Sequence, residues 1–263
     1  MKLRPPIKIH GGKYYLAARI VAMMPEHKTY LEPYGGAASV LLNKPIAPVE
    51  VYNDLDGRLT RLFRIIRDNG DELRRRLALT PYSEVEFITA QKGPGGVIDD
   101  IEAARIDYVI WRMSLGGRGD AFSYTKHRIR RCMPDVVSGY LSAIDDEMPK
   151  IIDRLRCVQI MCRPAVEVIK AWDSPDTFIY LDPPYVHSTR VAGQYAFEMT
   201  DDEHTELYNT LEICASKAMI SGYRCDLYDK LYKDWNLTEW DMAAHAAGGK
   251  AKNRRIECVW KNY

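Results

Sequence analysis

Residues 29–54 read TYLEPYGGAASVLLNKPIAPVEVYND. Thr29–Glu32 and Pro48–Asn53 are short and rich in β-branched or aromatic residues, which favours strands. The glycine pair Gly35-Gly36 indicates a turn, which we expect to open into a short helix over Ala37–Asn43. Strand, turn, helix and strand make a βαβ unit, which implies parallel strands joined by a right-handed crossover. The chain is therefore expected to have an α/β fold.

The same alternation of strand and helix patterns returns after residue 156. Strands are expected at Cys157–Met161, Thr177–Leu181 and Ala218–Ser221, and a helix at Asp201–Ser216. Asn236–Asp241 and Ile256–Trp260 alternate apolar and polar residues, which predicts an antiparallel pair at the edge of the sheet. Together with the first unit, these patterns predict one Rossmann-like, doubly wound sheet.

The middle of the chain has a different pattern. Residues 71–170 carry mostly helical spacing, with helices expected near 99–113 and 138–154 on either side of a basic loop. An amphipathic helix before them begins at Asp56 and is expected to end at Gly70. We therefore expect a sheet domain made of residues 1–57 and 156–263, interrupted by a helical domain over residues 58–155.

Composition limits the class of protein. The chain has 263 residues, of which 46% are hydrophobic and 28% charged, as in ordinary globular proteins. No apolar run reaches the roughly 18 residues that a membrane span needs, and the first residues, MKLRPPIKIHGG, have no apolar signal core. We therefore expect a cytoplasmic protein without a membrane partner.

The cysteines and histidines form no metal-binding pattern. Six cysteines are present without a CxxC pair, and the six histidines make no HxH or HExxH pattern. No metal is therefore expected. The absence of an HxE and PCxxC signature also disfavours the zinc nucleobase deaminases.

Positive charge is concentrated in one segment. The net charge of the whole chain is only +1, yet residues 112–131 hold six lysine or arginine residues against one acid. One basic face can serve a nucleic-acid partner while the average charge stays near neutral.

Asp182-Pro183-Pro184-Tyr185 directly follows the apolar stretch 177–181. It therefore lies at the carboxyl end of a buried strand, where open α/β sheets bind ligands. The prolines stiffen the turn and remove two backbone donors, which leaves carbonyl groups to accept hydrogen bonds. An aspartate and a rigid carbonyl can accept both hydrogens of an amino group, and the tyrosine ring can stack on a base.

Three further motifs occur in the positions of a nucleotide-type site. The turn after the first strand contains Glu32, Tyr34 and Gly35, but no GxGxxG pattern, which disfavours a nicotinamide cofactor. Asp54 ends the next strand, 22 residues after Glu32, where a carboxylate typically holds ribose hydroxyls or caps a helix. Lys13, in a Gly-Gly-Lys motif, can neutralise a ligand carboxylate or be an ordinary surface lysine.

The order of these motifs resembles the Dam-like, D12-class DNA adenine-N6 methyltransferases, particularly phage and prophage members. The likeness extends to Ile220–Tyr223 and to the final ten residues, RRIECVWKNY. It implies a class I methyltransferase fold, with the helical insert as target-recognition domain. The implied reaction is site-specific methyl transfer from S-adenosylmethionine to the N6 amine of adenine in double-stranded DNA, with base flipping. Such relatives occur in prokaryotic or phage-infected cells, typically as monomers, with a dimer on DNA as the alternative.

The resemblance also implies roles for individual residues. Ile9, Lys13, Glu32, Tyr34, Gly35, Asp54 and Asp182 would bind the donor, with Ile9 standing where relatives often have an aromatic residue four positions before the lysine. Asp182 and the Pro183 carbonyl would hold the adenine amine, Pro184 would stiffen the turn, and Tyr185 would stack on the flipped base. The loop Val186–Phe197 would close over the site, and Cys162–Ala165 replaces a segment that is often acidic in relatives.

The basic loop supplies the expected DNA contacts. Arginine is the usual reader of guanine edges, which favours Arg118 for base recognition together with Tyr124, Lys126 and Arg128. Arg130 and Arg131 are expected at phosphates. The alternative is a solvated basic loop without a partner.

Two other functions remain open at this level. The first is an amine methyltransferase that acts on RNA, as in rRNA-type enzymes that share the DPPY tetrad. The 150 residues between Glu32 and Asp182 favour DNA, because they leave room for a recognition domain. The second is a DNA-binding relative that has lost activity, which the intact Lys13, Asp54, Asp182 and Tyr185 disfavour.

Overall fold

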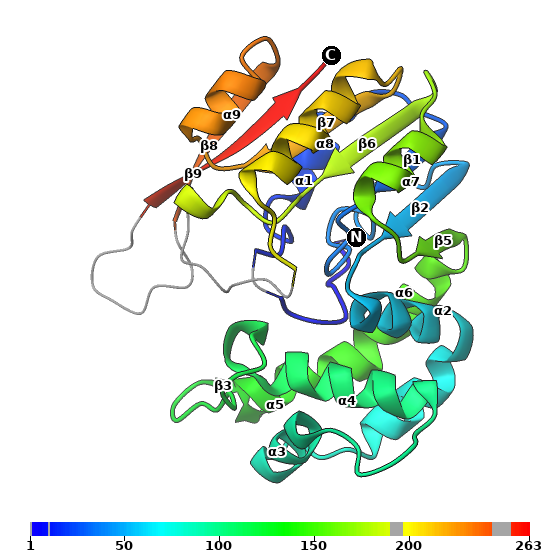
Figure 1. Cartoon of the computed structure of the whole chain (residues 1–263). Coiled ribbons are helices and arrows are strands. Elements are labelled where there is room, and N and C mark those ends of the chain that lie inside the picture. The colour runs from blue at the N-terminus through cyan, green and yellow to red at the C-terminus, as the bar shows by residue number, and fades with distance from the viewer. Residues whose placement is uncertain (1, 10, 190–196, 244–253) are drawn as a thin grey trace. The chain divides into compact units, whose positions relative to one another are not determined.

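The computed structural model describes residues 2–9, 11–189, 197–243 and 254–263 (Figure 1). Packing within the chain divides it into two compact units. The helical unit comprises residues 1–23, 36–45 and 57–160, and the sheet unit comprises residues 24–35, 46–56 and 161–263. The assignment of residues 1–57 and 156–263 to catalysis, and of 58–155 to DNA recognition, concerns function and stays a prediction.

A seven-stranded mixed sheet confirms the expected α/β fold. The strands follow one another across the sheet as β5 (Val158–Met161), β2 (Val49–Asn53), β1 (Thr29–Glu32), β6 (Thr177–Leu181), β7 (Lys217–Gly222), β9 (Arg254–Lys261) and β8 (Asn236–Ala243). β2, β1, β6 and β7 run parallel to one another. β9 is antiparallel to both β7 and β8, which confirms the predicted antiparallel pair at the edge.

β6 shows why the centre of the sheet forms as predicted. All five of its residues, TFIYL, are buried, as expected for a strand that is covered on both faces. Ile179 and Leu181 belong to a core cluster that includes Leu207 of helix α8 (Asp201–Ile213). Figure 1 shows α8 beside α7 (Ala165–Trp172), and the two helices pack together. A capping box of Thr200 and Glu203 begins α8.

The strand order reverses between β1 and β6. From β1 the chain adds β2 and then β5 on one side, and it later adds β6 and β7 on the other side. At such a switch point the turns after neighbouring strands lead away from each other and leave a crevice at the carboxyl ends of the strands. The fold therefore places its ligand site after β1 and β6.

The expected helix over Ala37–Asn43 is wrong, because residues 36–44 form a series of turns. Ala38 has a φ of 56°, which is outside the right-handed helical region. The amide of Leu42 still donates to the Ala38 carbonyl at 3.0 Å, but the next amide, of Asn43, donates to the Val40 carbonyl. The local spacing of apolar residues predicted a helix, but the backbone does not keep the regular hydrogen bonds of a helix over this segment.

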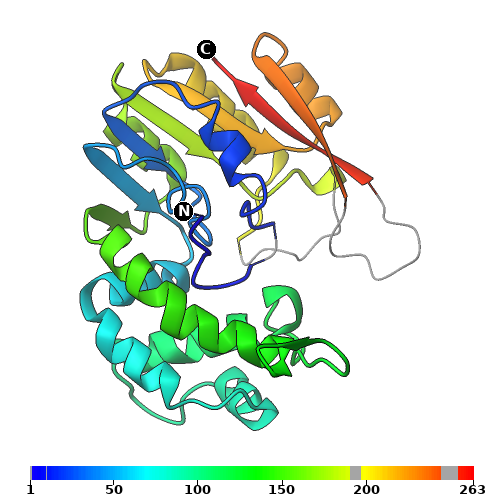
Figure 2. The same ribbon diagram turned by 180° about the vertical axis from the view of Figure 1, so that it is seen from behind.

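The helical unit contains α2 (Gly57–Ala78), which exceeds its expected length. The chain kinks at Asn69, where φ is −135°, and then continues as a helix beyond the predicted end at Gly70. A Cβ atom at Gly70 would lie 2.5 Å from the Cδ1 atom of Ile152, so this glycine permits close helix packing. Figure 2 shows α2 beside α6 (Met148–Leu155), the helix that carries Ile152.

The helical unit contains several further elements, of which α4 is the longest. They are α1 (Ala17–Val21), α3 (Glu84–Lys92), α4 (Asp100–Met113), the 3-10 turn η1 (Leu115–Gly117), strands β3 (Ile129–Arg130) and β4 (Met133–Pro134), α5 (Asp135–Ser142) and the π-helical turn η2 (Ala143–Glu147). The sheet unit also contains the 3-10 turn η3 (His187–Thr189) and α9 (Asp226–Leu231). Within the described ranges, no helix combines the length and the apolar composition that crossing a bilayer requires.

Candidate functional site

Four turns meet the same edge of the sheet. Because β2, β1, β6 and β7 are parallel, the segments that follow them emerge together. These segments begin at Asp54, Pro33, Asp182 and Tyr223. The predicted donor and catalytic motifs of the sheet unit therefore lie at one edge, beside the switch point.

The turn after β1 lies flat against a buried aromatic ring. A Cβ atom at Gly35 would lie 2.1 Å from the Cε2 atom of Tyr52, so only glycine fits there. The amide of Gly35 donates to the Asn53 carbonyl at 2.8 Å. The Glu32 side chain, 2% exposed, accepts a hydrogen bond of 2.7 Å from the Tyr30 hydroxyl. At Gly35 this turn therefore has no side chain over its backbone, and it follows the buried Glu32 carboxylate.

Asn53 joins the turns after three strands, a role that its position in the sequence did not reveal. Its fully buried side chain donates from Nδ2 to the carbonyls of Pro33 (2.9 Å) and Arg163 (3.0 Å). Its Oδ1 atom accepts a bond of 3.0 Å from the Arg163 amide. Pro33 follows β1, Asn53 is the last residue of β2, and Arg163 lies after β5. One side-chain amide therefore links the ends of three strands.

Asp54 follows β2 at the same edge, and one of its carboxylate oxygens accepts a hydrogen bond from the backbone. Its Oδ1 atom accepts a hydrogen bond of 2.9 Å from the Asp56 amide, an Asx turn just before α2. Burial raises the pKa of the half-buried Tyr34 hydroxyl, and the nearby carboxylates of Glu203 and Asp54 raise it further. The Tyr34 hydroxyl therefore lies close enough to the Asp54 carboxylate for the charge of the carboxylate to disfavour its ionisation.

The DPPY turn is buried around its tyrosine. Pro183 is buried, whereas Asp182 and Pro184 are half-buried. Tyr185 is 5% exposed, and its hydroxyl donates a hydrogen bond to Oε1 of Glu257. Burial raises the pKa of Tyr185 well above its usual value, and the charges of Asp182 and Glu257 raise it further. Tyr185 is therefore a neutral ring at physiological pH.

A second aromatic ring contacts Tyr185. The Tyr223 ring meets it edge-on, with centroids 4.7 Å apart and planes at 84°. The strands that precede the two rings, β6 and β7, are joined by a buried hydrogen bond of 2.9 Å between the Tyr180 hydroxyl and Ser221 Oγ. Two aromatic rings and the Asp182 carboxylate thus lie at the ends of adjacent strands, a chemistry that suits a planar ring with an amino group.

The predicted donor residues Lys13 and Ile9 belong to the helical unit. Lys13 is 7% exposed, and its ammonium group donates to the Gly11 carbonyl at 3.0 Å. Ile9 is half-buried, and a Cβ atom at Gly36 would lie 2.8 Å from its Cδ1 atom. Ile9 therefore lies against Gly36 within the helical unit, and Lys13 lies beside Gly11 in the same unit. In the predicted lid Val186–Phe197, residues 190–196 lie outside the described residues.

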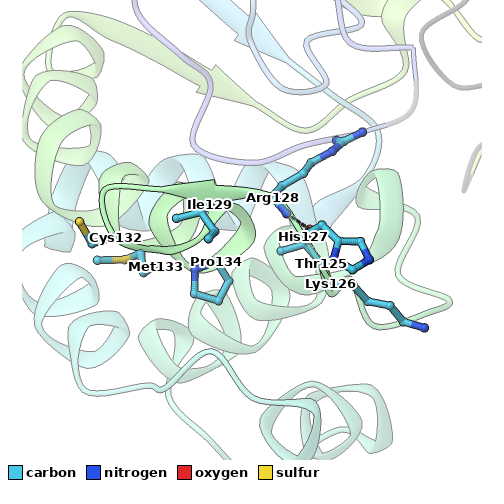
Figure 3. Close-up of a pocket in the computed structure, with 8 residues that line it drawn as sticks. All are labelled: Thr125, Lys126, His127, Arg128, Ile129, Cys132, Met133 and Pro134. Carbon is cyan, nitrogen blue, oxygen red and sulfur yellow. Dashed lines mark hydrogen bonds between the residues drawn. The ribbon is translucent and has the colours of Figure 1, made fainter.

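The six predicted DNA contacts are all exposed in the helical unit, at positions 118, 124, 126, 128, 130 and 131. Before them, a Cβ atom at Gly117 would lie 2.0 Å from the Lys8 carbonyl oxygen, so this turn packs tightly against residues near the N-terminus. Figure 3 shows a surface pocket in the same loop, with Arg128 and Lys126 directed away from each other. The pocket is lined by Thr125, Lys126, His127, Arg128, Ile129, Cys132, Met133 and Pro134.

The hairpin of β3 and β4 has an unusual two-residue loop. Ile129 pairs with Pro134, and Arg130 pairs with Met133, so Arg131 and Cys132 form the loop. Their φ angles are 53° and 60°, as in the hairpin turns that normally favour Asn-Gly. The Arg131 guanidinium also forms an ion pair of 2.9 Å with Asp146 in η2. Arg131, predicted at a phosphate, is therefore held by a carboxylate.

Metal-binding side chains do not gather in the part of the chain that the structure describes. No group of three or more histidine, cysteine, aspartate or glutamate residues is arranged there to hold a metal ion. The site at the sheet edge consists of backbone, carboxylates and aromatic rings.

An α/β sheet of this order, with an antiparallel pair at one edge, is consistent with a class I methyltransferase. The profile of the D12 class N6 adenine-specific DNA methyltransferases matches residues 10–111 and 142–245, and the chain belongs to this family. The type II methyltransferase M1.LlaDCHI of Lactococcus lactis subsp. cremoris is 26% identical to it over 287 residues, covering 100% of this chain and 96% of that protein. The expected reaction, methylation of adenine N6 in DNA, is thereby confirmed.

Proposed function

We propose that this adenine methyltransferase takes its methyl group from S-adenosylmethionine and acts on an adenine flipped out of double-stranded DNA. The observation that carries the proposal is the meeting of the Glu32–Gly35, Asn53–Asp54 and Asp182–Tyr185 segments at the switch point of the sheet. When bound, S-adenosylmethionine supplies a methyl group that its sulfonium has already activated. The duplex hides the N6 atom, so the target base leaves the stack before transfer.

The residues at the sheet edge fit such a donor. Gly35 has no side chain and is held on Tyr52, which lets a ligand approach its backbone. The Asp54 carboxylate, at the end of β2, suits the ribose hydroxyls. Glu32 and Tyr34 would border the methionine part, and the ammonium group of Lys13 would neutralise its carboxylate.

The DPPY turn would position the base. The Asp182 carboxylate and the Pro183 carbonyl accept the two N6 hydrogens, which favours a tetrahedral nitrogen with its lone pair directed at the methyl carbon. Pro184 stiffens the turn, and the neutral Tyr185 ring stacks on the base. Positioning of this kind can contribute on the order of 7–11 kcal/mol at its best. The methylated ammonium is a strong acid, so its proton can pass to water.

We expect Asp182→Ala to abolish transfer while donor binding persists at least in part, because the main role of Asp182 is to hold the amine of the base. Transfer of the labelled methyl group from S-adenosylmethionine to duplex DNA measures turnover, and equilibrium dialysis measures donor binding. Wild-type turnover in this variant would contradict the role of Asp182.

Residues 58–155 would be the target-recognition domain, inserted in a protein of the phage or prophage type that acts as a monomer. Its exposed basic loop would contact DNA, with Arg118, Tyr124, Lys126 and Arg128 at bases and Arg130 and Arg131 at phosphates. Arg118→Ala should relax the sequence preference of methylation. Arg130→Ala should weaken binding to all sequences and reduce the salt slope by about one. Unchanged binding in both variants would contradict this interface.

The direct test is nucleoside mass spectrometry after incubation with methyl-labelled S-adenosylmethionine and duplex DNA. We expect labelled N6-methyladenine, at sites that sequencing of the same sample identifies. Label that appears at one short sequence supports site-specific recognition. Label in RNA but not in duplex DNA would overturn the proposed substrate.

A further inference from the structure

Glu257 lies far from the DPPY turn in the sequence but touches its tyrosine. The Glu257 Oε1 atom accepts the hydrogen bond of the Tyr185 hydroxyl across 72 positions of the chain. Glu257 is 7% exposed and Tyr185 is 5% exposed, so the bond is shielded from water. A hydrogen bond from a buried hydroxyl to a carboxylate is stronger than one between neutral groups.

The sheet explains how β9 delivers this residue. β9 runs antiparallel to β7, and Cys258 pairs with Gly222, the last residue of β7. The start of β9 therefore lies beside the carboxyl end of β7. β7 is parallel to β6, so the DPPY turn begins at the same edge. Glu257, one residue before Cys258, reaches this turn because β9 runs in the opposite direction to β7.

The bond limits the orientation of the Tyr185 ring. Tyr223 contacts one side of the ring edge-on. The hydroxyl bond to Glu257 restrains the far end of the ring, because rotation about the Cα–Cβ bond would carry the hydroxyl away from the carboxylate. The packed Tyr223 ring restrains rotation of the ring plane about the Cβ–Cγ bond. A buried carboxylate is unfavourable for stability unless it is paired, and an apolar residue would fill the same space without that penalty. Packing alone therefore does not account for a glutamate here.

We propose that Glu257 is a positioning residue, which holds the Tyr185 ring in the orientation on which the target adenine stacks. The inference rests on the proposed role of Tyr185 as the stacking partner of the base. Glu257 itself does not touch the base or the donor in this assignment. In this assignment Glu257 acts on the base through its hydrogen bond to Tyr185, so removal of that bond from either end should have the same consequence for stacking.

The test is a double-mutant cycle on the full-length enzyme. Glu257→Leu and Tyr185→Phe remove the bond from opposite ends, and each should lower kcat by between about tenfold and a hundredfold, with KM for S-adenosylmethionine unchanged. The double variant should lose no more than either single variant. Glu257→Gln keeps an oxygen that accepts the bond and should restore most of kcat.

A spectroscopic measurement separates positioning from a general loss of structure. 2-Aminopurine replaces the target adenine in the duplex, and its fluorescence falls when it stacks on an aromatic ring. We expect brighter fluorescence in Glu257→Leu and Tyr185→Phe than in the wild type or Glu257→Gln. Glu239→Leu is the matched control, because Glu239 lies on the neighbouring strand β8 with its side chain 41% exposed.

Three results would overturn the inference. These are full kcat in Glu257→Leu, additive losses in the double variant, or equal losses in Glu257→Gln and Glu257→Leu. If Glu257→Leu does not fold, Tyr185→Phe decides, and unchanged kcat and fluorescence in that variant reject the proposal. Tyr185→Ala tests the underlying role separately, since wild-type turnover there rejects Tyr185 as the stacking residue.

Discussion

Gly35 and Asn53 show how single residues shape the proposed donor site. Gly35 is required because the Tyr52 ring occupies the place of a side chain, and Tyr52 is fully buried. Asn53 is required because three backbone groups of neighbouring turns use its amide. Both residues act on the backbone rather than on a ligand. Their substitution should therefore affect stability and donor binding together.

Gly35→Ala should lower the free energy of unfolding by about 1–3 kcal/mol, because the new methyl group overlaps the buried Tyr52 ring. Urea denaturation measures this change, and calorimetry should show weaker binding of S-adenosylmethionine. Gly57→Ala is the control, since a Cβ atom there meets nothing within 4 Å. Equal stability of the two variants would contradict the proposed overlap.

Asn53→Asp keeps the shape of the side chain but removes its two donated bonds. The buried carbonyl of Pro33 then loses its partner, at about 1–3 kcal/mol, and the part-buried carbonyl of Arg163 loses one at a smaller cost. We expect lower stability and weaker donor binding, measured as above. Asn236→Asp serves as control, because its single bond to the Tyr263 carbonyl is exposed. Full donor affinity in Asn53→Asp would show that the turns hold without it.

At the scale of elements, the β3–β4 hairpin combines exposed charge with an unfavourable backbone. Residues other than glycine at positive φ cost roughly 1–2 kcal/mol each, and the hairpin has two of them, Arg131 and Cys132. The ion pair with Asp146 ties its loop to the π-helical turn η2. Such features often cluster at functional segments. The hairpin is therefore an element held in place by contacts outside itself.

Asp146→Asn should raise the affinity for DNA, because Asp146 competes with phosphates for the Arg131 guanidinium. A hydrogen bond from Ser142 and the charge of Arg131 lower the pKa of Asp146, which is therefore ionised at neutral pH. Fluorescence anisotropy with duplex DNA should show the largest gain at low salt. Asp145→Asn, at the neighbouring exposed position, is the control. Equal affinities of both variants would show that Arg131 does not bind phosphate.

At the scale of the whole molecule, both units are discontinuous. The helical unit needs residues 1–23 and 36–45 in addition to 57–160. The Leu3 amide donates to Asn43 Oδ1 at 2.8 Å, and the Arg154 side chain donates to the Leu41 carbonyl at 2.8 Å. Hydrogen bonds and buried residues such as Ile20 and Leu41 therefore tie this unit to segments that are distant in the chain.

A fragment of residues 57–160 should consequently lack a cooperative unfolding transition. It retains the helices α2 to α6 but loses the N-terminal segments that pack against them. Far-ultraviolet circular dichroism should show helix, whereas the near-ultraviolet signal should be weak. A sharp transition at the midpoint of the full chain would contradict this dependence.

Local patterns in the sequence were sufficient for the chemistry and for most strands. The expected bounds of Thr29–Glu32 and Thr177–Leu181 agree with β1 and β6, because a buried strand carries its apolar residues in one short run. The family was also recognisable, because its motifs follow those strands directly. Motifs that depend on neighbours in the chain were therefore predictable.

Tertiary structure decided the features that depend on distant contacts. The turns over Ala37–Asn43 replace a helix, and a second helical segment follows the kink at Asn69, where Gly70 packs closely against Ile152. The roles of Asn53 and Glu257 arise from residues that lie 110 and 72 positions away. The physical reason is that apolar periodicity records which residues are buried, whereas the partner of a buried polar group is set by how the strands are ordered.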